Sequence, residues 1–427
     1  MPSTTIESVI GRRLWDSRGR PTVEAEVRLT SGAIGRALAP AGASRGSGEA
    51  VDRRDGGARF GGQDVTNAVA AVTGEIARHL RGRDASDQPA IDTAVIALDG
   101  TQDKSRLGGN AMIAVSMAVA HAAAAAAGLP LWRHLAGGRA VRLPLPEIQI
   151  FGGGAHAGRR VDVQDFMVVA VGAADYAQAL DWSAEIYRAA GALMAEAGLL
   201  QGVADEGGFW PAFATNEAAL DMLVRAIERA GFRAGEDVAI SLDIAASELG
   251  SKGRYRLGLE GRALDSDGMI ELLEGWLGRY PIVAIEDPLA EDDAAGLARF
   301  TQRAGGIAVV GDDFLVTNAA RIRAAAAQGA CNTALIKPNQ AGTLSETKAA
   351  FDAALASGWG AIVSARSGET EDVTIVHLAI GWGAPLLKVG SFARSERLAK
   401  WNEGLRIAEA LGGSGPLPPA SALPWRR

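Results

Sequence analysis

Six apolar runs decide the fold of this chain: VAISLD (238–243), PIVAIED (281–287), IAVVGDD (307–313), NTALIK (332–337), GAIVSAR (360–366) and APLLK (384–388). Each run is rich in β-branched and aliphatic residues, and a longer segment with helical spacing leads to the next one. Uninterrupted apolar runs are typical of parallel strands that are buried on both faces. The repeat therefore predicts an α/β fold in which strand–helix units close into a (β/α)-barrel.

Charged residues close these runs. They are, in chain order, Asp243, Glu286, Asp312, Lys337, Arg366 and Lys388. In such a barrel the active site collects residues from the carboxyl ends of the strands. Three acids followed by three cations at that end indicate a metal site that faces an anionic substrate.

Length and composition limit the class of protein. A barrel needs only about 250 residues, so a chain of 427 residues has room for a second domain. The formal net charge of −7 and the absence of Lys/Arg blocks argue against nucleic-acid and membrane-surface partners. The single cysteine, Cys331, fits a reducing compartment, and no signal peptide is visible. Residues 111–129 are mostly alanine, so we expect a packed helix there and a cytoplasmic protein without a membrane partner.

The first part of the chain has a different pattern. Residues 6–38 alternate apolar and polar positions around a short turn, as antiparallel strands do, and helical periods follow. We expect residues 1–135 to form an α+β capping domain and residues 136–427 to form the barrel with the active site. The glycine-rich segment APAGASRGSGEA (39–50) follows these strands. It is either a plain connector or a lid that closes over a ligand with Ser44 at its tip.

The three acids at the strand ends are oxygen donors only. No cysteine accompanies Asp243, Glu286 and Asp312, and the whole chain has five histidines, too few to favour a nitrogen-rich site. A small set of oxygen ligands favours Mg²⁺, which keeps several waters and also binds substrate oxygens. A single acid of this kind would more often be a surface charge or an ion pair, but three on consecutive strands predict metal binding.

The cations suggest the reaction. Lys337 and Lys388 directly follow buried runs, where an unpaired ammonium is costly and has a lowered pKa. A structural salt bridge is the alternative role for either lysine. Beside Mg²⁺ such a lysine is a usable base for a proton next to a carboxylate, and divalent ions can stabilise the resulting enediolate. Arg366 and Ser367 would donate hydrogen bonds to a phosphate or phosphonate.

A series of longer motifs runs along the whole chain: DSRGRPTVEAEV (16–27), GASRGSGEA, LDGTQDKSRLGGNA, GGGAHAG, DEGGFWP, LDIAASE, IEDPLAEDD, VGDDFLVTN, LIKPNQAGTLSET, RSGETED and RSERLAKWN. In content and order these motifs resemble the enolase family. The resemblance implies the enolase fold, an N-terminal α+β capping domain and a C-terminal modified (β/α)8 TIM barrel with an irregular ββαα start. It also implies a homodimer or a larger assembly such as a homo-octamer.

The resemblance assigns metal ligands by position. Asp243, Glu286 and Asp312 match the ligands of a tightly bound Mg²⁺, and Ser44 matches the loop residue that closes onto a second Mg²⁺. We therefore expect two Mg²⁺ ions in each active site.

It also assigns residues to catalysis and to substrate binding. In catalysis it implies Lys337 as the base, with Glu206, Asp165 and His156 around the departing hydroxyl. For substrate binding we expect Lys388 on the carboxylate and, around the phosphorus group and the loop, Arg366, Ser367, Gln164, Arg45 and Ser44.

Four positions depart from the family pattern. Asp165 in QDFM replaces a glutamate, and Ala365 in SARSGE replaces a histidine. Arg45 replaces the threonine after Ser44, and Ala204 replaces the glycine before the DEGG motif. Moving a catalytic carboxylate by about 1 Å can cost about 10²-fold in rate. All four positions are in substrate-facing motifs, which indicates an altered substrate.

These departures lead us to expect a Mg-dependent enzyme that forms an enediolate from a phosphorylated or phosphonylated three-carbon carboxylate. We expect a paralogue in phosphonate or phosphinate natural-product (antibiotic) biosynthesis, of the carboxyphosphonoenolpyruvate synthase type, with room for a nucleotide-activated co-substrate. In this hypothesis Arg45 and the space beside Ala365 accept a bulkier or more anionic phosphorus group. The alternatives are phosphopyruvate hydratase, which converts 2-phosphoglycerate to phosphoenolpyruvate, and a non-catalytic enolase-like scaffold.

Overall fold

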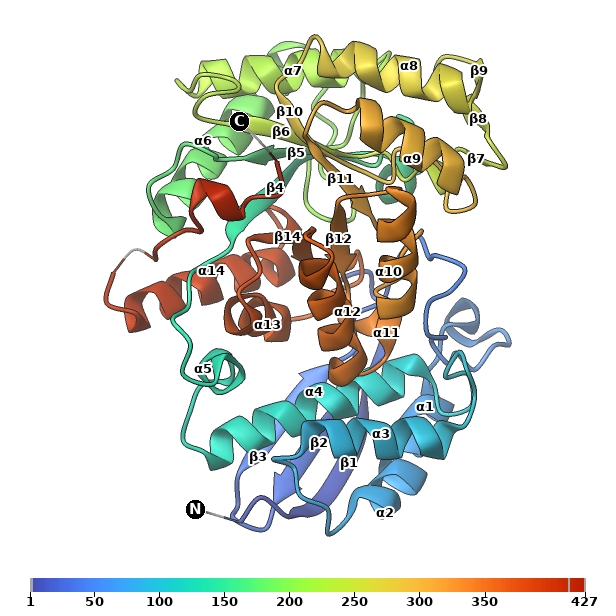
Figure 1. The fold of residues 1–427 in the computed structure, drawn as a ribbon, viewed down its shortest axis with the longest axis vertical. Helices are drawn as coiled ribbons and strands as arrows, with labels where there is room; N and C mark the ends of the chain where they lie inside the picture. Colours follow the sequence, from blue (N-terminus) through green and yellow to red (C-terminus); the bar gives the residue numbers. More distant parts are fainter. Residues whose placement is uncertain (1–2, 414, 426–427) are drawn as a thin grey trace.

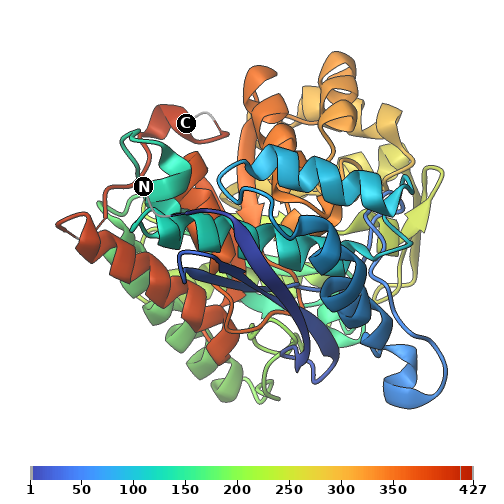
Figure 2. The same ribbon diagram turned by 90° about the horizontal axis from the view of Figure 1, so that it is seen from below.

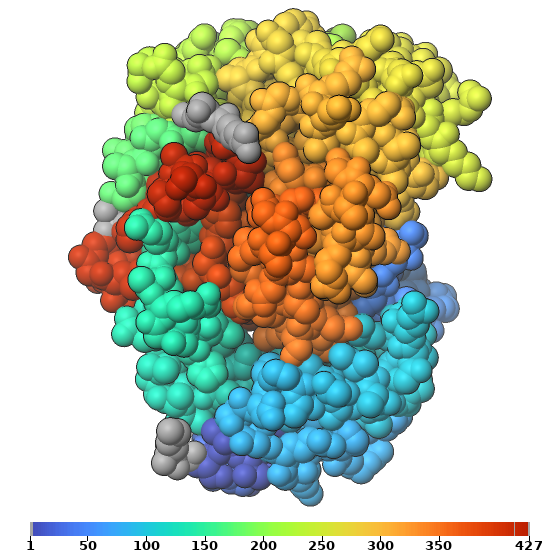
Figure 3. All heavy atoms as spheres, in the orientation of Figure 1, coloured from blue at the N-terminus to red at the C-terminus, as the bar shows by residue number. Residues whose placement is uncertain are grey.

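The computed structural model describes residues 3–413 and 415–425. An antiparallel sheet with its helices forms one part of the molecule, and a closed barrel surrounded by helices forms the other (Figure 1). Viewed from below, the N-terminal sheet and helices lie in front of the barrel (Figure 2). The space-filling view shows the two parts in contact, with the α3–α4 region against the segment around α12 (Figure 3).

The N-terminal sheet has the order β1-β2-β3, with both pairs antiparallel. Its strands are β1 (Ile6–Trp15), β2 (Pro21–Leu29) and β3 (Ile34–Leu38), which confirms the antiparallel strands predicted for residues 6–38. The helices of this part are η1 (Arg59–Gly62), α1 (Thr66–Ala71), η2 (Val72–Ile76), α2 (Ala77–Leu80), α3 (Gln88–Asp99), α4 (Gly109–Ala126) and α5 (Leu131–Ala136).

Helix α4 is the core of the N-terminal part. It packs on β2 and β3 and also contacts α11 and α12 of the barrel part. A Cβ on Gly35 of β3 would lie 2.1 Å from the Ala118 carbonyl oxygen, so glycine is needed for this close approach. α4 is long and apolar enough to cross a membrane, but 89% of it is buried inside the protein. The expected packed helix is therefore confirmed.

The barrel closes in the order β10-β11-β12-β13-β14-β4-β5-β6. Its strands are β4 (Leu145–Gly152), β5 (Asp165–Val169), β6 (Ala239–Asp243), β10 (Ile282–Glu286), β11 (Ala308–Gly311), β12 (Thr333–Ile336), β13 (Gly360–Ser364) and β14 (Leu386–Ser391). Six of them are the predicted apolar runs. β14 continues past Lys388, with a register shift towards Gly390, so this lysine lies within its strand and does not end it.

One strand runs against the others. β5 is antiparallel to both β4 and β6, and the order β4-β5-α6-α7-β6 is the expected ββαα start. Because β5 is reversed, its first residue, Asp165, lies beside Asp243, the last residue of β6. A residue at the start of β5 thus joins the site that the other strands build with their ends.

Helices surround the barrel: η3 (Gly154–Ala157), α6 (Tyr176–Glu196), α7 (Asn216–Arg229), η4 (Ala246–Glu248), α8 (Ser266–Leu277), α9 (Ala294–Arg303), α10 (Ala319–Gln328), α11 (Pro338–Ala341), α12 (Leu344–Ala356), α13 (Thr374–Trp382), α14 (Ser395–Ala410) and η5 (Ala420–Ala422). Side chains cap several of them, as Asp175 does for α6 and Thr215 for α7. The long step between β6 and β10 holds a small sheet that the repeat did not predict, β7 (Gly250–Ser251), β8 (Arg254–Leu257) and β9 (Arg262–Asp265).

Candidate active site

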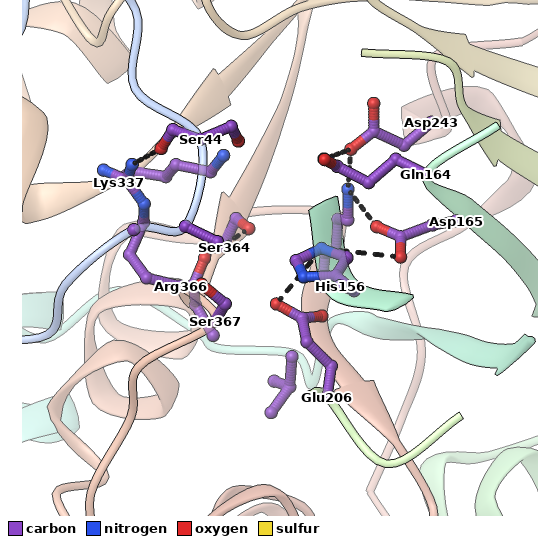
Figure 4. A pocket seen from close by; sticks show the side chains of 15 residues that line it. Ser44, His156, Gln164, Asp165, Glu206, Asp243, Lys337, Ser364, Arg366 and Ser367 are labelled. Atoms are coloured by element: carbon purple, nitrogen blue, oxygen red, sulfur yellow. Dashed lines mark hydrogen bonds and ion pairs between the residues drawn. The ribbon is translucent and has the colours of Figure 1, made fainter. Parts of the chain in front are cut away.

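A polar pocket lies where the loop 39–50 meets the active-site end of the barrel (Figure 4). Most of the predicted catalytic and substrate-binding residues line it. Its lining residues are Gly42, Ala43, Ser44, His156, Gln164, Asp165, Glu206, Asp243, Lys337, Ser364, Ala365, Arg366, Ser367, Lys388 and Val389. Of the six predicted strand-end charges, Asp243, Lys337, Arg366 and Lys388 are among these lining residues, whereas Glu286 and Asp312 are not.

Lys388 lies at the centre of the carboxylates. Its Nζ is 2.7 Å from Glu286 Oε2, 3.0 Å from Asp243 Oδ2 and 3.3 Å from Asp165 Oδ2. Burial by itself would lower the pKa of Lys388, but Asp243 and Glu286 outweigh it and raise this pKa well above its usual value. Lys388 is thus a fixed positive charge, which suits binding of a substrate carboxylate.

Lys337 forms an ion pair with Asp312, whose other oxygen accepts a hydrogen bond of 2.8 Å from Gln340 Nε2. Burial lowers the pKa of Lys337, but Asp312 outweighs burial and the pKa is raised overall. The sequence predicts a lowered pKa at this position. The pKa is raised instead because Asp312 pairs directly with the ammonium.

His156, Asp165 and Glu206 form a second cluster, whose ligand-type atoms lie within 4.8 Å of one another. His156 Nε2 is 3.7 Å from Asp165 Oδ1 and 3.8 Å from Glu206 Oε1. Burial raises the pKa of Asp165; for Glu206, burial also raises the pKa, but His156 and Arg397 outweigh it and lower the pKa overall. Two neighbouring acids with pKa values pushed apart can divide the roles of proton donor and proton acceptor.

The predicted metal ligands Asp243, Glu286 and Asp312 are all buried in this region and present oxygen atoms only. Glu286 Oε1 is buried without a hydrogen-bond partner, so a cation would satisfy it. Such a donor set fits Mg²⁺. Ser44, the expected ligand of a second ion, lines the pocket from the loop side.

A further acidic group comprises Asp287, Asp312 and Asp313. Asp287 accepts hydrogen bonds from the backbone N–H of Asp312 at 2.8 Å and of Asp313 at 2.9 Å. These bonds fix the turn that follows β11, so Asp287 stabilises the fold around Asp312, a predicted metal ligand.

Sequence reasoning missed Glu49. Its carboxylate pairs with both terminal nitrogens of Arg366, at 2.9 and 3.1 Å, and also accepts from the Gly46 N–H at 3.0 Å. Arg366 Nη2 donates to the Ser44 carbonyl oxygen at 2.9 Å as well. Glu49 is the one acid in the segment 39–50, a signal that could have identified it.

Arg397 on α14, which is fully buried, was also not predicted from the sequence. Its guanidinium donates to the carbonyl oxygens of Arg366 at 2.7 Å and Val389 at 2.8 Å, and also to that of Ser367. The Ser367 hydroxyl accepts from Arg18 Nη1 at 3.2 Å. The predicted phosphate-holding pair is therefore held from two sides, by both parts of the molecule.

The remaining predicted residues take different positions. Gln164 Nε2 donates to Asp243 Oδ2 at 3.0 Å, inside the pocket. Ala365 is buried and lines the pocket wall. Arg45 is exposed and is not among the lining residues, because the loop directs the neighbouring Ser44 inward. Ala204 is buried beside Gly152.

Comparisons with known proteins cover nearly the whole chain. Residues 6–135 match the family model "Enolase, N-terminal domain", and residues 140–421 match "Enolase, C-terminal TIM barrel domain". A curated "Enolase" of Rubrobacter xylanophilus is 50% identical over 422 residues, 98% of each chain.

This full-length similarity contradicts one expectation from the sequence. The assignment to phosphonate or phosphinate biosynthesis, of the carboxyphosphonoenolpyruvate synthase type, is wrong, because the curated relative that is 50% identical over 98% of this chain is an enolase. The four departures from the family pattern therefore do not indicate a phosphonate or phosphinate pathway. One of the two positions invoked for a larger phosphorus group, Arg45, does not line the pocket.

Proposed function

This chain belongs to the enolase family, and we propose that it is a phosphopyruvate hydratase, a Mg-dependent lyase that converts 2-phosphoglycerate to phosphoenolpyruvate. The observation that carries this proposal is the placement of Lys337 across the pocket from His156, Asp165 and Glu206 (Figure 4). A base on one side and a cluster of acids on the other suit removal of a proton and of a hydroxyl from adjacent carbons.

The substrate would lie between these groups. Lys388 would hold the carboxylate, and Arg366 and Ser367 would hold the phosphate. Lys337, once released from Asp312, would accept the proton next to the carboxylate. On the opposite side, Asp165 and Glu206 would share the transfer of a proton to the departing hydroxyl.

Two Mg²⁺ ions are part of the proposal. Asp243, Glu286 and Asp312 would hold one, and Ser44 would contribute to the site of the other. When bound, these ions would supply positive charge to the substrate carboxylate and so make the neighbouring proton more acidic. We also propose that the enzyme is cytoplasmic and forms a homodimer or homo-octamer. Light scattering of the purified protein would test the oligomeric state.

Turnover of 2-phosphoglycerate tests the proposal directly. With Mg²⁺, the purified protein should form phosphoenolpyruvate, and chelation with EDTA should abolish the reaction reversibly. Lys337→Met should lose at least about 10²–10⁴-fold in kcat, because it removes the base. Lys348→Met is the matched control, since Lys348 is on α12, does not line the pocket, and interacts with Asp352 and the Phe351 ring. No turnover by the wild-type protein, or full activity of Lys337→Met, would refute the proposal.

A further inference from the structure

Gln149 joins two parts of the catalytic cluster. It lies on β4, is fully buried and was not among the residues predicted from the sequence. Its Nε2 donates a hydrogen bond to Asp165 Oδ1, and its Oε1 accepts one of 2.9 Å from the Gly208 N–H. One amide therefore connects the carboxylate on β5 to the turn 204–208.

The backbone around this amide leaves space for it. A Cβ on Gly208 would lie 2.4 Å from Gln149 Oε1, and a Cβ on Gly152 would lie 3.0 Å from the same atom. Any side chain at Gly208 would displace the amide, and one at Gly152 would crowd it. Both positions next to the Gln149 amide are therefore glycine, which leaves room for its hydrogen bonds.

The turn 204–208 carries Glu206. The carbonyl oxygen of Glu206 accepts from the Ser391 N–H at 2.9 Å, and the Asp205 N–H donates to the His156 carbonyl oxygen at 3.2 Å. The turn is therefore fixed to β14 and to η3, which carries His156. A side chain that ties Asp165 to this turn also sets where Asp165 lies relative to Glu206.

We propose that Gln149 is a positioning residue that holds the short Asp165 side chain at the distance from Glu206 that the reaction needs. Asp165 is one methylene shorter than the glutamate of the family pattern, and the long Gln149 side chain reaches it from the neighbouring strand. The long Gln149 side chain thus keeps the contact between β4 and the carboxylate of residue 165, although that residue has the shorter side chain. The expected changes in kcat rest on the proposed function. The expected position of the residue 165 carboxylate does not.

Kinetics of single and paired variants test the idea. Gln149→Leu should lower kcat by about 10²-fold while KM changes less than about 3-fold, because Asp165 is displaced where it meets the departing hydroxyl. Gln149→Asn and Asp165→Glu should each lower kcat. The double variant Q149N/D165E restores the combined length and should recover kcat to within about 10-fold of wild type. A double variant no better than its worse parent would overturn the proposal.

The matched control is Gln88→Leu. Gln88 Nε2 also donates to a carboxylate, Asp92 Oδ1, at 3.0 Å, but on α3 in the N-terminal part. This variant should keep the wild-type kcat. If Gln149→Leu also kept it, Gln149 would have no positioning role.

Crystal structures of the wild type, Gln149→Leu and Q149N/D165E give a test without turnover. The carboxylate of residue 165 should leave its place beside the turn 204–208 in Gln149→Leu and return in the double variant. A carboxylate that stays in place in Gln149→Leu would refute the positioning role. A wild-type protein that fails to convert 2-phosphoglycerate would instead refute the proposed function, and the structures would still decide the role of Gln149.

Discussion

The guanidinium of Arg366 is almost fully occupied by the protein itself. It has five N–H donors. Glu49 takes one from each terminal nitrogen, Asn339 accepts from Nη1 at 3.1 Å, and the Ser44 carbonyl accepts from Nη2. Within the described part of the chain, only the Nε–H has no acceptor. Under the proposed function, a phosphate would bind through Nε–H or displace one of these acceptors, and displacement of the Ser44 carbonyl would couple phosphate binding to the position of the loop 39–50.

The ion pair between Arg366 and Glu49 is buried, so breaking it on one side should be costly. Arg366→Met leaves the Glu49 carboxylate uncompensated and should lower the free energy of unfolding by about 3–5 kcal/mol, measured by urea unfolding. The double variant R366M/E49Q removes both charges and should regain much of this loss. A double variant as unstable as Arg366→Met would show that the charge is not the cause.

At the scale of elements, the loop 39–50 depends on Gly42. A Cβ at this position would lie 2.0 Å from Arg366 Nη2 and 2.5 Å from the Ser44 carbonyl oxygen. Gly42→Ala should therefore push the loop away from Arg366 and raise KM for 2-phosphoglycerate about 10-fold, equivalent to about 1.4 kcal/mol of binding.

The control for this loop variant is Gly275→Ala on α8. A Cβ there meets no atom within 4 Å, so KM should be unchanged and stability slightly increased. An unchanged KM in Gly42→Ala would mean that the loop tolerates the extra carbon without moving from Arg366.

The elements also show what the sequence could predict. Uninterrupted apolar runs predicted six barrel strands, and four of the charges at their ends line the pocket, because parallel strands bring their ends together. Asp165 was found only through the family resemblance, since β5 is reversed and presents its first residue. Gln149 and Glu49 carry no periodic signal. The role of Gln149 depends on its contacts with Asp165 and the turn 204–208, and that of Glu49 on its ion pair with Arg366, which lies far away in the sequence.

At the scale of the whole molecule, two histidines lie where the N-terminal part meets the barrel part. His121 on α4 and His377 on α13 are 6.0 Å apart, ring centre to ring centre, and His121 Nε2 is 2.9 Å from Thr374 Oγ1. Burial and His121 lower the pKa of His377 to about 4, although Glu403 and Asp372 act in the opposite direction. Burial also lowers the pKa of His121, so both rings are neutral at neutral pH.

This junction should weaken in acid. An unfolded histidine has a pKa of about 6.5, so the unfolded chain takes up a proton below that pH while folded His377 does not until about pH 4. The free energy of unfolding should fall by up to about 1.4 kcal/mol per pH unit across this window. His377→Gln should flatten the pH dependence of urea unfolding, and His79→Gln, which changes a partly buried histidine on α2 away from this junction, is the comparison. Equal slopes for both variants would contradict this assignment.

The pairing of β14 with β4, which closes the barrel, has a consequence for synthesis on the ribosome. Leu386 pairs with Leu145, so one edge of β4 stays open until almost the whole chain has been translated. At about 5–20 residues per second, this interval lasts on the order of 10–50 s. An open strand edge can pair with other nascent chains in that time. The nascent chain is therefore most exposed to aggregation late in translation, after its N-terminal sheet has formed.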